Sequence, residues 1–106
     1  FVPHLVPLDR GILETIYTRV NPGTTDDTIR EALDVYQTSP FVRLTGNTPP
    51  EIKHVAHTNF CDIGWILDDT RLVLVACIDN LVKGAAGQAL QSFNIAHDLE
   101  ESKGLL

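Results

Sequence analysis

Apolar and polar positions alternate along the first twenty residues and predict two extended segments on either side of a bend. Residues 1–8 are mostly apolar, and residues 11–20 set Ile12 and Ile16 on the face opposite Leu13 and Tyr17. The Asp-Arg-Gly sequence at positions 9–11 marks the bend. The chain therefore begins abruptly, inside an expected strand, which we interpret as a sign of truncation.

A helix is predicted after the Asn-Pro-Gly turn at residues 21–23. Thr24 or Thr25 can cap it, and Asp26 and Asp27 favour the positive end of the helix dipole. Pro40 follows beyond its end. The apolar positions that share one face of this helix are Ile29, Ala32, Leu33 and Tyr36.

The middle of the chain predicts a sheet. Residues 41–44 suggest a short strand, and residues 52–60 favour another weakly. Residues 64–67 and 71–78 are apolar runs separated by three polar residues, which predicts an antiparallel hairpin. The run at 71–78 is apolar on both faces, so we expect a central strand that is covered on both sides.

Asp79 or Asn80 is predicted to cap a last helix that runs to about His97. Its expected buried positions are Leu81, Ala85, Leu90, Phe93 and Ala96. Residues 99–106 are predicted to form a frayed tail after a single domain at 1–98. The fold class is α+β, with a mixed, mostly antiparallel sheet and helices packed on one face.

Composition narrows the function of this 106-residue chain. Its formal net charge is -6, and its eight lysines and arginines are scattered, which excludes nucleic acids and anionic membranes as expected partners. No run approaches the length of a membrane span. Two cysteines and two nearby histidines, His54 and His57, lack the spacing of a metal site, so no metal is predicted. A reducing compartment fits best, either the cytoplasm, which we expect, or the interior of an organelle.

The predicted last helix contains two glycines in its first turns, Gly84 and Gly87, each of which costs about 1 kcal/mol relative to alanine. Close packing of the helix against the sheet is one explanation. The other is a helix start that faces a ligand, with Asn80 and Lys83 beside exposed backbone. The spacing does not match a dinucleotide-binding loop.

The bend near the N-terminus is the second candidate site. His4 and Arg10 can hold an anionic substrate, because arginine offers a fork of donors to carboxylate or phosphate. The alternative is a surface turn with an Asp9–Arg10 ion pair. Cys61 is disfavoured as a nucleophile, because its neighbour Asp62 is negative and a thiolate needs positive surroundings.

Three motifs occur in order: FVPHLVPLDRGIL at residues 1–13, NFCDIG at 59–64 and CIDNLVKGAAGQA at 77–89. Together they resemble the C-terminal domain of N-acetyl-gamma-glutamyl-phosphate reductases, and the resemblance extends to about residue 94. It implies a two-domain enzyme of arginine biosynthesis. A Rossmann domain binds NADP and carries the catalytic cysteine. A second domain, similar to the catalytic domain of glyceraldehyde-phosphate dehydrogenase, supplies substrate contacts and the dimer interface.

The resemblance also implies the reaction and which part of the enzyme carries the catalytic residues. A thiolate displaces phosphate from a small acyl phosphate, hydride reduces the thioester to the semialdehyde, and a histidine acts as acid and base. This sequence contains neither the catalytic cysteine nor that histidine, so we expect no catalytic residue and no activity in the isolated chain. The partners implied are the chain's own Rossmann domain and a second copy in a homo-oligomer.

The functional residues of the family are assigned to this chain only at positions where the motifs match. Asn80 matches the asparagine that approaches the nicotinamide carboxamide, and Lys83 and Gly84 lie close behind it as cofactor-binding candidates. His4 and Arg10 are the substrate-binding candidates. Aspartate-semialdehyde dehydrogenases are similar but tend to have Arg-Val-Pro and Gly-His where this chain has Leu-Val-Pro at 5–7 and Gly-Ile at 11–12. An aminoadipyl phosphate substrate, a stand-alone dimerisation or ligand-binding module and a purely structural domain remain alternatives.

Overall fold

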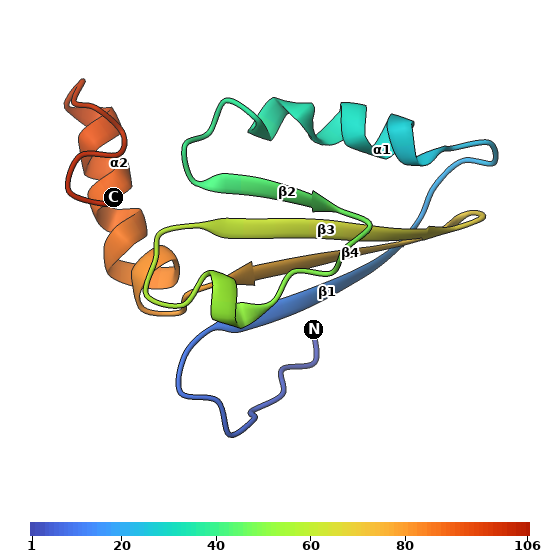
Figure 1. Ribbon diagram of the computed structural model, residues 1–106, viewed down its shortest axis with the longest axis horizontal. Helices are drawn as coiled ribbons and strands as arrows, with labels where there is room; N and C mark the ends of the chain where they lie inside the picture. The colour runs from blue at the N-terminus through green and yellow to red at the C-terminus, as the bar shows by residue number, and fades with distance from the viewer.

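A four-stranded mixed sheet forms the body of the protein in the computed structural model, which describes residues 1–106 (Figure 1). Its strands lie in the order β1-β4-β3-β2. The β4 strand pairs antiparallel with β1 and β3, whereas β2 pairs parallel with β3. The predicted α+β class with a mixed sheet is confirmed. The strand bounds are β1 Ile12–Arg19, β2 Val42–Gly46, β3 Cys61–Asp68 and β4 Arg71–Ile78.

The predicted hairpin is present, and its second strand is central. Strands β3 and β4 are joined by a two-residue turn that lies between the paired residues Asp68 and Arg71. Asp69 in this turn adopts a left-handed conformation (φ 54°). The expectation that β4 is covered on both sides is wrong. Val73 and Leu74 stay partly exposed, because neither face of the sheet is covered along its whole length.

Helix α1 (Asp26–Leu33) covers one face of the sheet (Figure 1). The Thr25 hydroxyl accepts the Thr28 N–H at 3.3 Å, which confirms the predicted cap. Ile29 packs with Trp65 and Leu72 in the apolar core. A 3₁₀ turn at Asp34–Tyr36 follows. Ala32 and Tyr36, expected on the buried face, are exposed, because the helix covers the sheet mainly through Ile29 and Leu33.

Residues 47–60 cover part of the opposite face, and the strand expected at 52–60 is wrong. A 3₁₀ turn at Ile52–His54 begins a series of local turns, in which Val55 donates to Ile52 O and Thr58 donates to Val55 O. The backbone hydrogen bonds are therefore satisfied within the loop rather than by a neighbouring strand. Val55 is fully buried.

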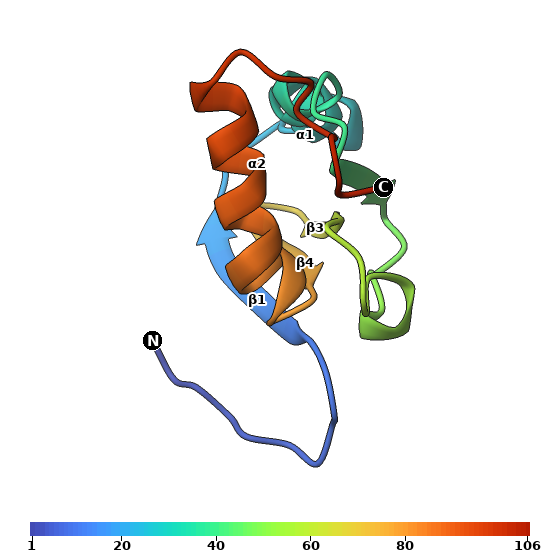
Figure 2. The same cartoon turned by 90° about the vertical axis from the view of Figure 1, so that its left-hand side faces the viewer.

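Helix α2 (Gly87–Ala96) stands at one end of the sheet, preceded by a π-helical turn at Val82–Ala86 (Figure 2). The predicted helix is confirmed, but its predicted buried face is wrong. The buried residues are Gly87, Gln91 and Asn94. The predicted inward positions Leu81, Ala85, Leu90, Phe93 and Ala96 are all exposed, because the helix docks through polar side chains instead.

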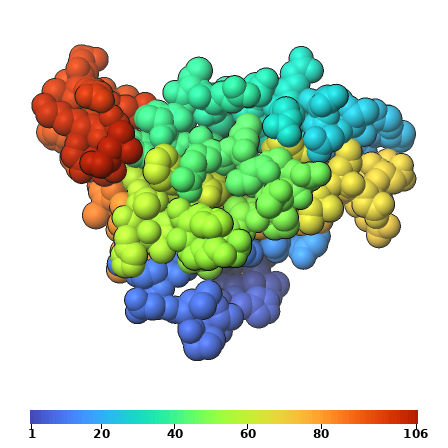
Figure 3. Space-filling view, viewed as in Figure 1, coloured from blue at the N-terminus to red at the C-terminus, as the bar shows by residue number.

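The two ends of the chain also differ from expectation. The tail at 99–106 is not frayed, because Asn94 Nδ2 donates to the carbonyls of Glu101 and Lys103 at 3.1 and 2.9 Å and folds it against α2. Residues 1–10 form no strand, because no neighbouring strand pairs with them and their two prolines lack the backbone N–H groups that a strand would donate. We call residues 1–10 the N-terminal strap. Figure 3 shows it in dark blue, projecting from the body.

Candidate functional site

Asp79 is fully buried at the start of the last helical segment, and its carboxylate accepts four hydrogen bonds. Oδ1 accepts from Arg10 Nη2 at 2.7 Å and from the backbone N–H groups of Leu81 and Val82 at 2.8 and 2.7 Å. Oδ2 accepts from the His57 N–H at 2.6 Å. One carboxylate thus joins the strap, the 47–60 loop and the helix start.

These contacts keep Asp79 ionised. Burial by itself would raise the pKa of the carboxyl group. The Arg10 guanidinium and the three backbone N–H donors outweigh that effect and hold the pKa well below its usual range. The site therefore contains a permanent buried ion pair at neutral pH. The Asp9–Arg10 pair considered from the sequence is absent, since Arg10 pairs with Asp79.

Asn80 forms the second link between the strap and the helix start. Its Oδ1 accepts the Gly11 N–H at 2.7 Å. Gly11 has φ 105°, which favours glycine, and a side chain there would overlap that of Ile52. Glycine at position 11 therefore allows the strap to turn closely past the 47–60 loop and reach Asn80.

A groove of about 710 Å³ lies between the strap and the end of β1. It brings together His4, Arg10 and Asn80, three of the five residues proposed from the sequence. His4 is exposed, whereas the Arg10 side chain is only 20% exposed and is already paired with Asp79. The other residues that line the groove are Leu5, Val6, Leu8, Asp9, Gly11, Ile12, Leu13, Thr15 and Ile52.

Lys83 does not line this groove. Its Nζ donates to Gln91 Oε1 at 2.7 Å and lies 5.8 Å from the centroid of the Phe41 ring. Burial lowers the pKa of Lys83, and the nearby Cys61 and Glu101 oppose that shift. The side chain has partners inside the fold, so its predicted contact with a cofactor stays a prediction.

The two glycines of the helix start differ in their surroundings. Gly87 is buried, and a Cβ atom there would overlap Asn59 Oδ1 and crowd Val82. Gly84 is exposed, and its nearest neighbour would be the Asp79 carbonyl at 3.3 Å. Close packing therefore explains Gly87. At Gly84 the backbone is accessible, as contact with a ligand would require, but Gly84 does not line the groove that contains Asn80.

The cysteines do not resemble nucleophiles. Burial raises the pKa of Cys61, with Lys83 opposing the shift and Asp62 adding to it. Burial likewise raises the pKa of Cys77 to about 11. Both groups are therefore thiols at neutral pH, and a thiol is a poor nucleophile. No group of three or more His, Cys, Asp or Glu side chains is placed to hold a metal ion.

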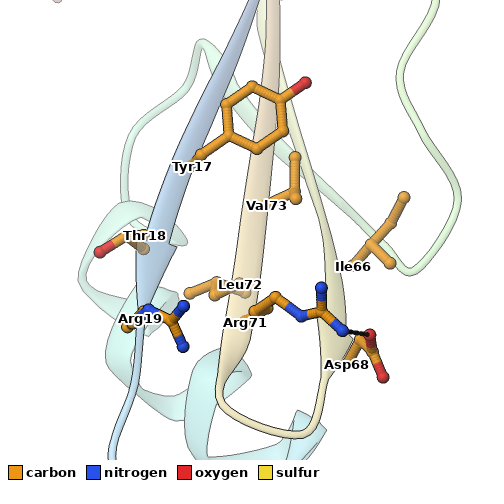
Figure 4. Close-up of a pocket in the computed structure, with 8 residues that line it drawn as sticks. All are labelled: Tyr17, Thr18, Arg19, Ile66, Asp68, Arg71, Leu72 and Val73. Atoms are coloured by element: carbon orange, nitrogen blue, oxygen red, sulfur yellow. Dashed lines mark hydrogen bonds and ion pairs between the residues drawn. The ribbon is translucent and has the colours of Figure 1, made fainter.

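A second exposed feature lies on the face of the sheet opposite α1, toward the β3–β4 turn. Tyr17, Ile66 and Val73 share this face, which we call the open sheet face. Tyr17 is 77% exposed, and Ile66 is 47% exposed. Figure 4 shows Tyr17, Val73 and Ile66 side by side on neighbouring strands around a hollow of about 540 Å³.

Sequence reasoning missed two features of the site. Asp79 was considered only as a helix cap, because its link to Arg10 spans 69 residues and leaves no local pattern. His57 was considered as a metal ligand and rejected, and its other role was not seen: it adopts a left-handed conformation (φ 63°) that presents its backbone N–H to Asp79. His57 lies in a series of turns, and no periodic pattern in that part of the sequence predicts its backbone conformation.

Comparison with known proteins gives consistent matches. The family model for the semialdehyde dehydrogenase dimerisation domain matches residues 1–80. Proteins named N-acetyl-gamma-glutamyl-phosphate reductase match 99% of the chain, at 58% identity in Desulforapulum autotrophicum, 50% in Pelotomaculum thermopropionicum and 49% in Geobacter metallireducens. The aligned segment is 31–32% of each of these relatives, so the chain spans about a third of their length. None of its helices is long and apolar enough to cross a membrane.

Proposed function

Because this chain belongs to the family of semialdehyde dehydrogenase dimerisation domains, we propose that it is the substrate-binding and dimerisation part of an NADP-dependent N-acetyl-gamma-glutamyl-phosphate reductase. The full-length protein would reduce N-acetyl-gamma-glutamyl phosphate to the semialdehyde in the cytoplasm. The observation that carries the proposal is the set of reductases that match nearly the whole chain at 43–58% identity. Motif residues from opposite ends of the chain, moreover, meet around one groove.

The strap is the substrate side of the proposed site. His4 is exposed on the groove, where its imidazole can donate to a carboxylate or phosphate oxygen. Arg10 adds a positive charge near the groove, although Asp79 neutralises part of it. An anionic acyl phosphate is thus matched by local charge even though the chain carries a net charge of -6.

The helix start is the cofactor side of the proposed site. The Asn80 Oδ1 is fixed by the Gly11 N–H, while its Nδ2 has no hydrogen-bond partner within the chain and fits a carboxamide oxygen. The exposed backbone at Gly84 leaves room for a flat ring. NADPH would supply the hydride when bound. This chain's part is to orient the ring and to hold the substrate beside it.

The open sheet face is the proposed dimer contact. A half-exposed cluster of apolar and aromatic side chains is typical of a surface that a second copy covers. Two identical faces related by a twofold axis would bury Tyr17, Ile66 and Val73 against their counterparts. This contact leaves the strap and Asn80 at the other end of the sheet accessible.

The proposal is tested by following NADPH oxidation by the purified full-length protein with N-acetyl-gamma-glutamyl phosphate. We expect turnover with this substrate and slower turnover with aminoadipyl phosphate. We also expect no turnover with the 106-residue chain alone, because the catalytic cysteine and histidine would lie elsewhere in the full-length protein. Absence of turnover by the folded full-length protein would overturn the proposal.

A further inference from the structure

We propose that Asp79 is a positioning residue: its carboxylate fixes the N-terminal strap against the start of the cofactor-facing helix and so sets the place of His4 relative to Asn80. The inference rests on the proposed function, whose substrate side is the strap. Asp79 itself is fully buried and does not line the groove. It therefore acts on the substrate through other residues.

The strap depends on very few contacts for its position. Its only internal backbone hydrogen bond joins Leu8 N–H to Val6 O at 2.7 Å, and residues 1–9 make no hydrogen bond to the rest of the chain. The first residues that do so are Arg10, which donates to Asp79, and Gly11, which donates to Asn80. Adjacent residues of the strap end thus bind adjacent residues of the helix start.

The strength of these two contacts differs. The Arg10–Asp79 bond joins two charges in a setting from which water is largely excluded, and such bonds are about twice as strong as neutral ones. The Gly11–Asn80 bond is neutral. Oδ1 of Asp79 also receives the Leu81 and Val82 N–H groups, so the same oxygen that holds Arg10 fixes the backbone on which Asn80 sits. Loss of this carboxylate would therefore release the strap and loosen Asn80 together.

The chain offers a matched control for the loss of a buried carboxylate. Asp62 is 5% exposed and accepts hydrogen bonds from Arg43 Nε and Nη2 at 2.6 and 2.9 Å. Asp79 and Asp62 each pair with an arginine, but Asp62 has no contact with the strap or with the groove. The Asp62→Asn variant therefore has the same chemical change and the same kind of cost in stability, without the proposed effect on substrate.

The experiment compares Asp79→Asn and Asp62→Asn in the full-length protein by steady-state kinetics and by hydrogen exchange of the peptide that covers residues 1–13. For Asp79→Asn we expect the KM for the acyl phosphate to rise about tenfold, with kcat within about threefold, and the strap end to exchange faster. For Asp62→Asn we expect a KM within about twofold of the wild-type value and unchanged exchange of the strap.

Each other outcome contradicts the proposal. An unchanged KM in Asp79→Asn would mean that the carboxylate does not position the substrate site, and a lower KM would mean that Arg10, once set free, binds the substrate directly. Equal KM increases in both variants would reduce Asp79 to a stabilising residue. If Asp79→Asn does not fold, Arg10→Gln keeps the backbone bonds of Asp79 and should give the same faster exchange. If the wild-type protein lacks reductase activity, the proposed function fails, and unchanged exchange in the Asp79 or Arg10 variant would separately refute the link to the strap.

Discussion

Gly87 lies directly against the side-chain oxygen of Asn59, and a methyl group at position 87 would overlap it. Asn59 is buried, and its Nδ2 is held by Gln91 Oε1 at 2.9 Å, so the amide has little freedom to move away. This close approach sets the distance between α2 and the chain that leads into β3.

The Gly87→Ala substitution should therefore destabilise the protein by about 1–3 kcal/mol, even though alanine favours helices. Urea unfolding of the variant, followed by circular dichroism, measures the change. A free energy of unfolding equal to or higher than the wild-type value would show that Asn59 and α2 adjust to the added methyl group without cost.

Gly84→Ala is the matched comparison at the exposed glycine. The added methyl group meets the Asp79 carbonyl at 3.3 Å and Ile78 Cδ1 at 3.5 Å, so we expect stability within about 1 kcal/mol of wild type. In the full-length protein the same methyl group should raise the KM for NADPH, because it would lie where the nicotinamide is proposed to approach. An unchanged KM for NADPH would remove Gly84 from the cofactor site.

The left-handed backbone of His57 gives a prediction about strain. Glycine adopts φ 63° without penalty, so His57→Gly should keep or raise the melting temperature. His57→Val should destabilise by about 1–2 kcal/mol, because a β-branched side chain is disfavoured there. His54→Gly is the control, since His54 lies in a 3₁₀ turn, and we expect it to destabilise. A melting temperature lowered equally by all three substitutions would contradict the role of the backbone conformation.

The ionised Asp79 predicts a pH dependence of stability. Its folded-state pKa lies below the unfolded-state pKa of about 3.9, so the unfolded state binds more protons as the pH falls. The stabilisation is present above that unfolded-state pKa and is lost as the pH decreases toward the folded-state pKa. Chemical unfolding at pH 7, 5, 4 and 3 should therefore show a steeper loss of stability below about pH 4 in the wild type than in Asp79→Asn. Parallel curves for the two proteins would show that Asp79 does not contribute this linkage.

The open sheet face predicts the oligomeric state. Tyr17→Arg places a charge in the proposed apolar contact and should shift the full-length protein from dimer toward monomer in light scattering. Tyr36→Arg is the control, because Tyr36 is also exposed but lies on the α1 side. A dimer of unchanged stability in Tyr17→Arg, or equal dissociation of both variants, would place the interface elsewhere.

Sequence patterns predicted the elements that short-range signals define, such as a run of apolar residues, a turn or a helix cap. The apolar run of β4 and the polar turn before it were sufficient to predict a central hairpin strand, whereas the cover that the run predicted on both faces of β4 is incomplete. The Thr25 cap was equally local. These elements are encoded within a few residues, so a single sequence reveals them.

The errors arose where long-range polar contacts decide the structure. Helix α2 docks through Gln91, and its other buried polar side chain, Asn94, binds the tail, so apolar periodicity pointed to the wrong face. The tail is held by Asn94 and Gln91 rather than by apolar burial. In the same way the residues of the candidate site were named individually, but the carboxylate of Asp79 that joins Arg10 to the helix start became visible only in three dimensions.

The most direct test of the account is the reverse reaction of the full-length protein, followed as NADPH formation from N-acetylglutamate semialdehyde, NADP and phosphate. We predict that absorbance at the nicotinamide band rises only when all three are present, and that Asn80→Ala slows this rise or raises the KM for NADP. NADPH formation that does not depend on phosphate, or none with any combination of the three, would contradict the assignment of this chain to an acyl-phosphate reductase.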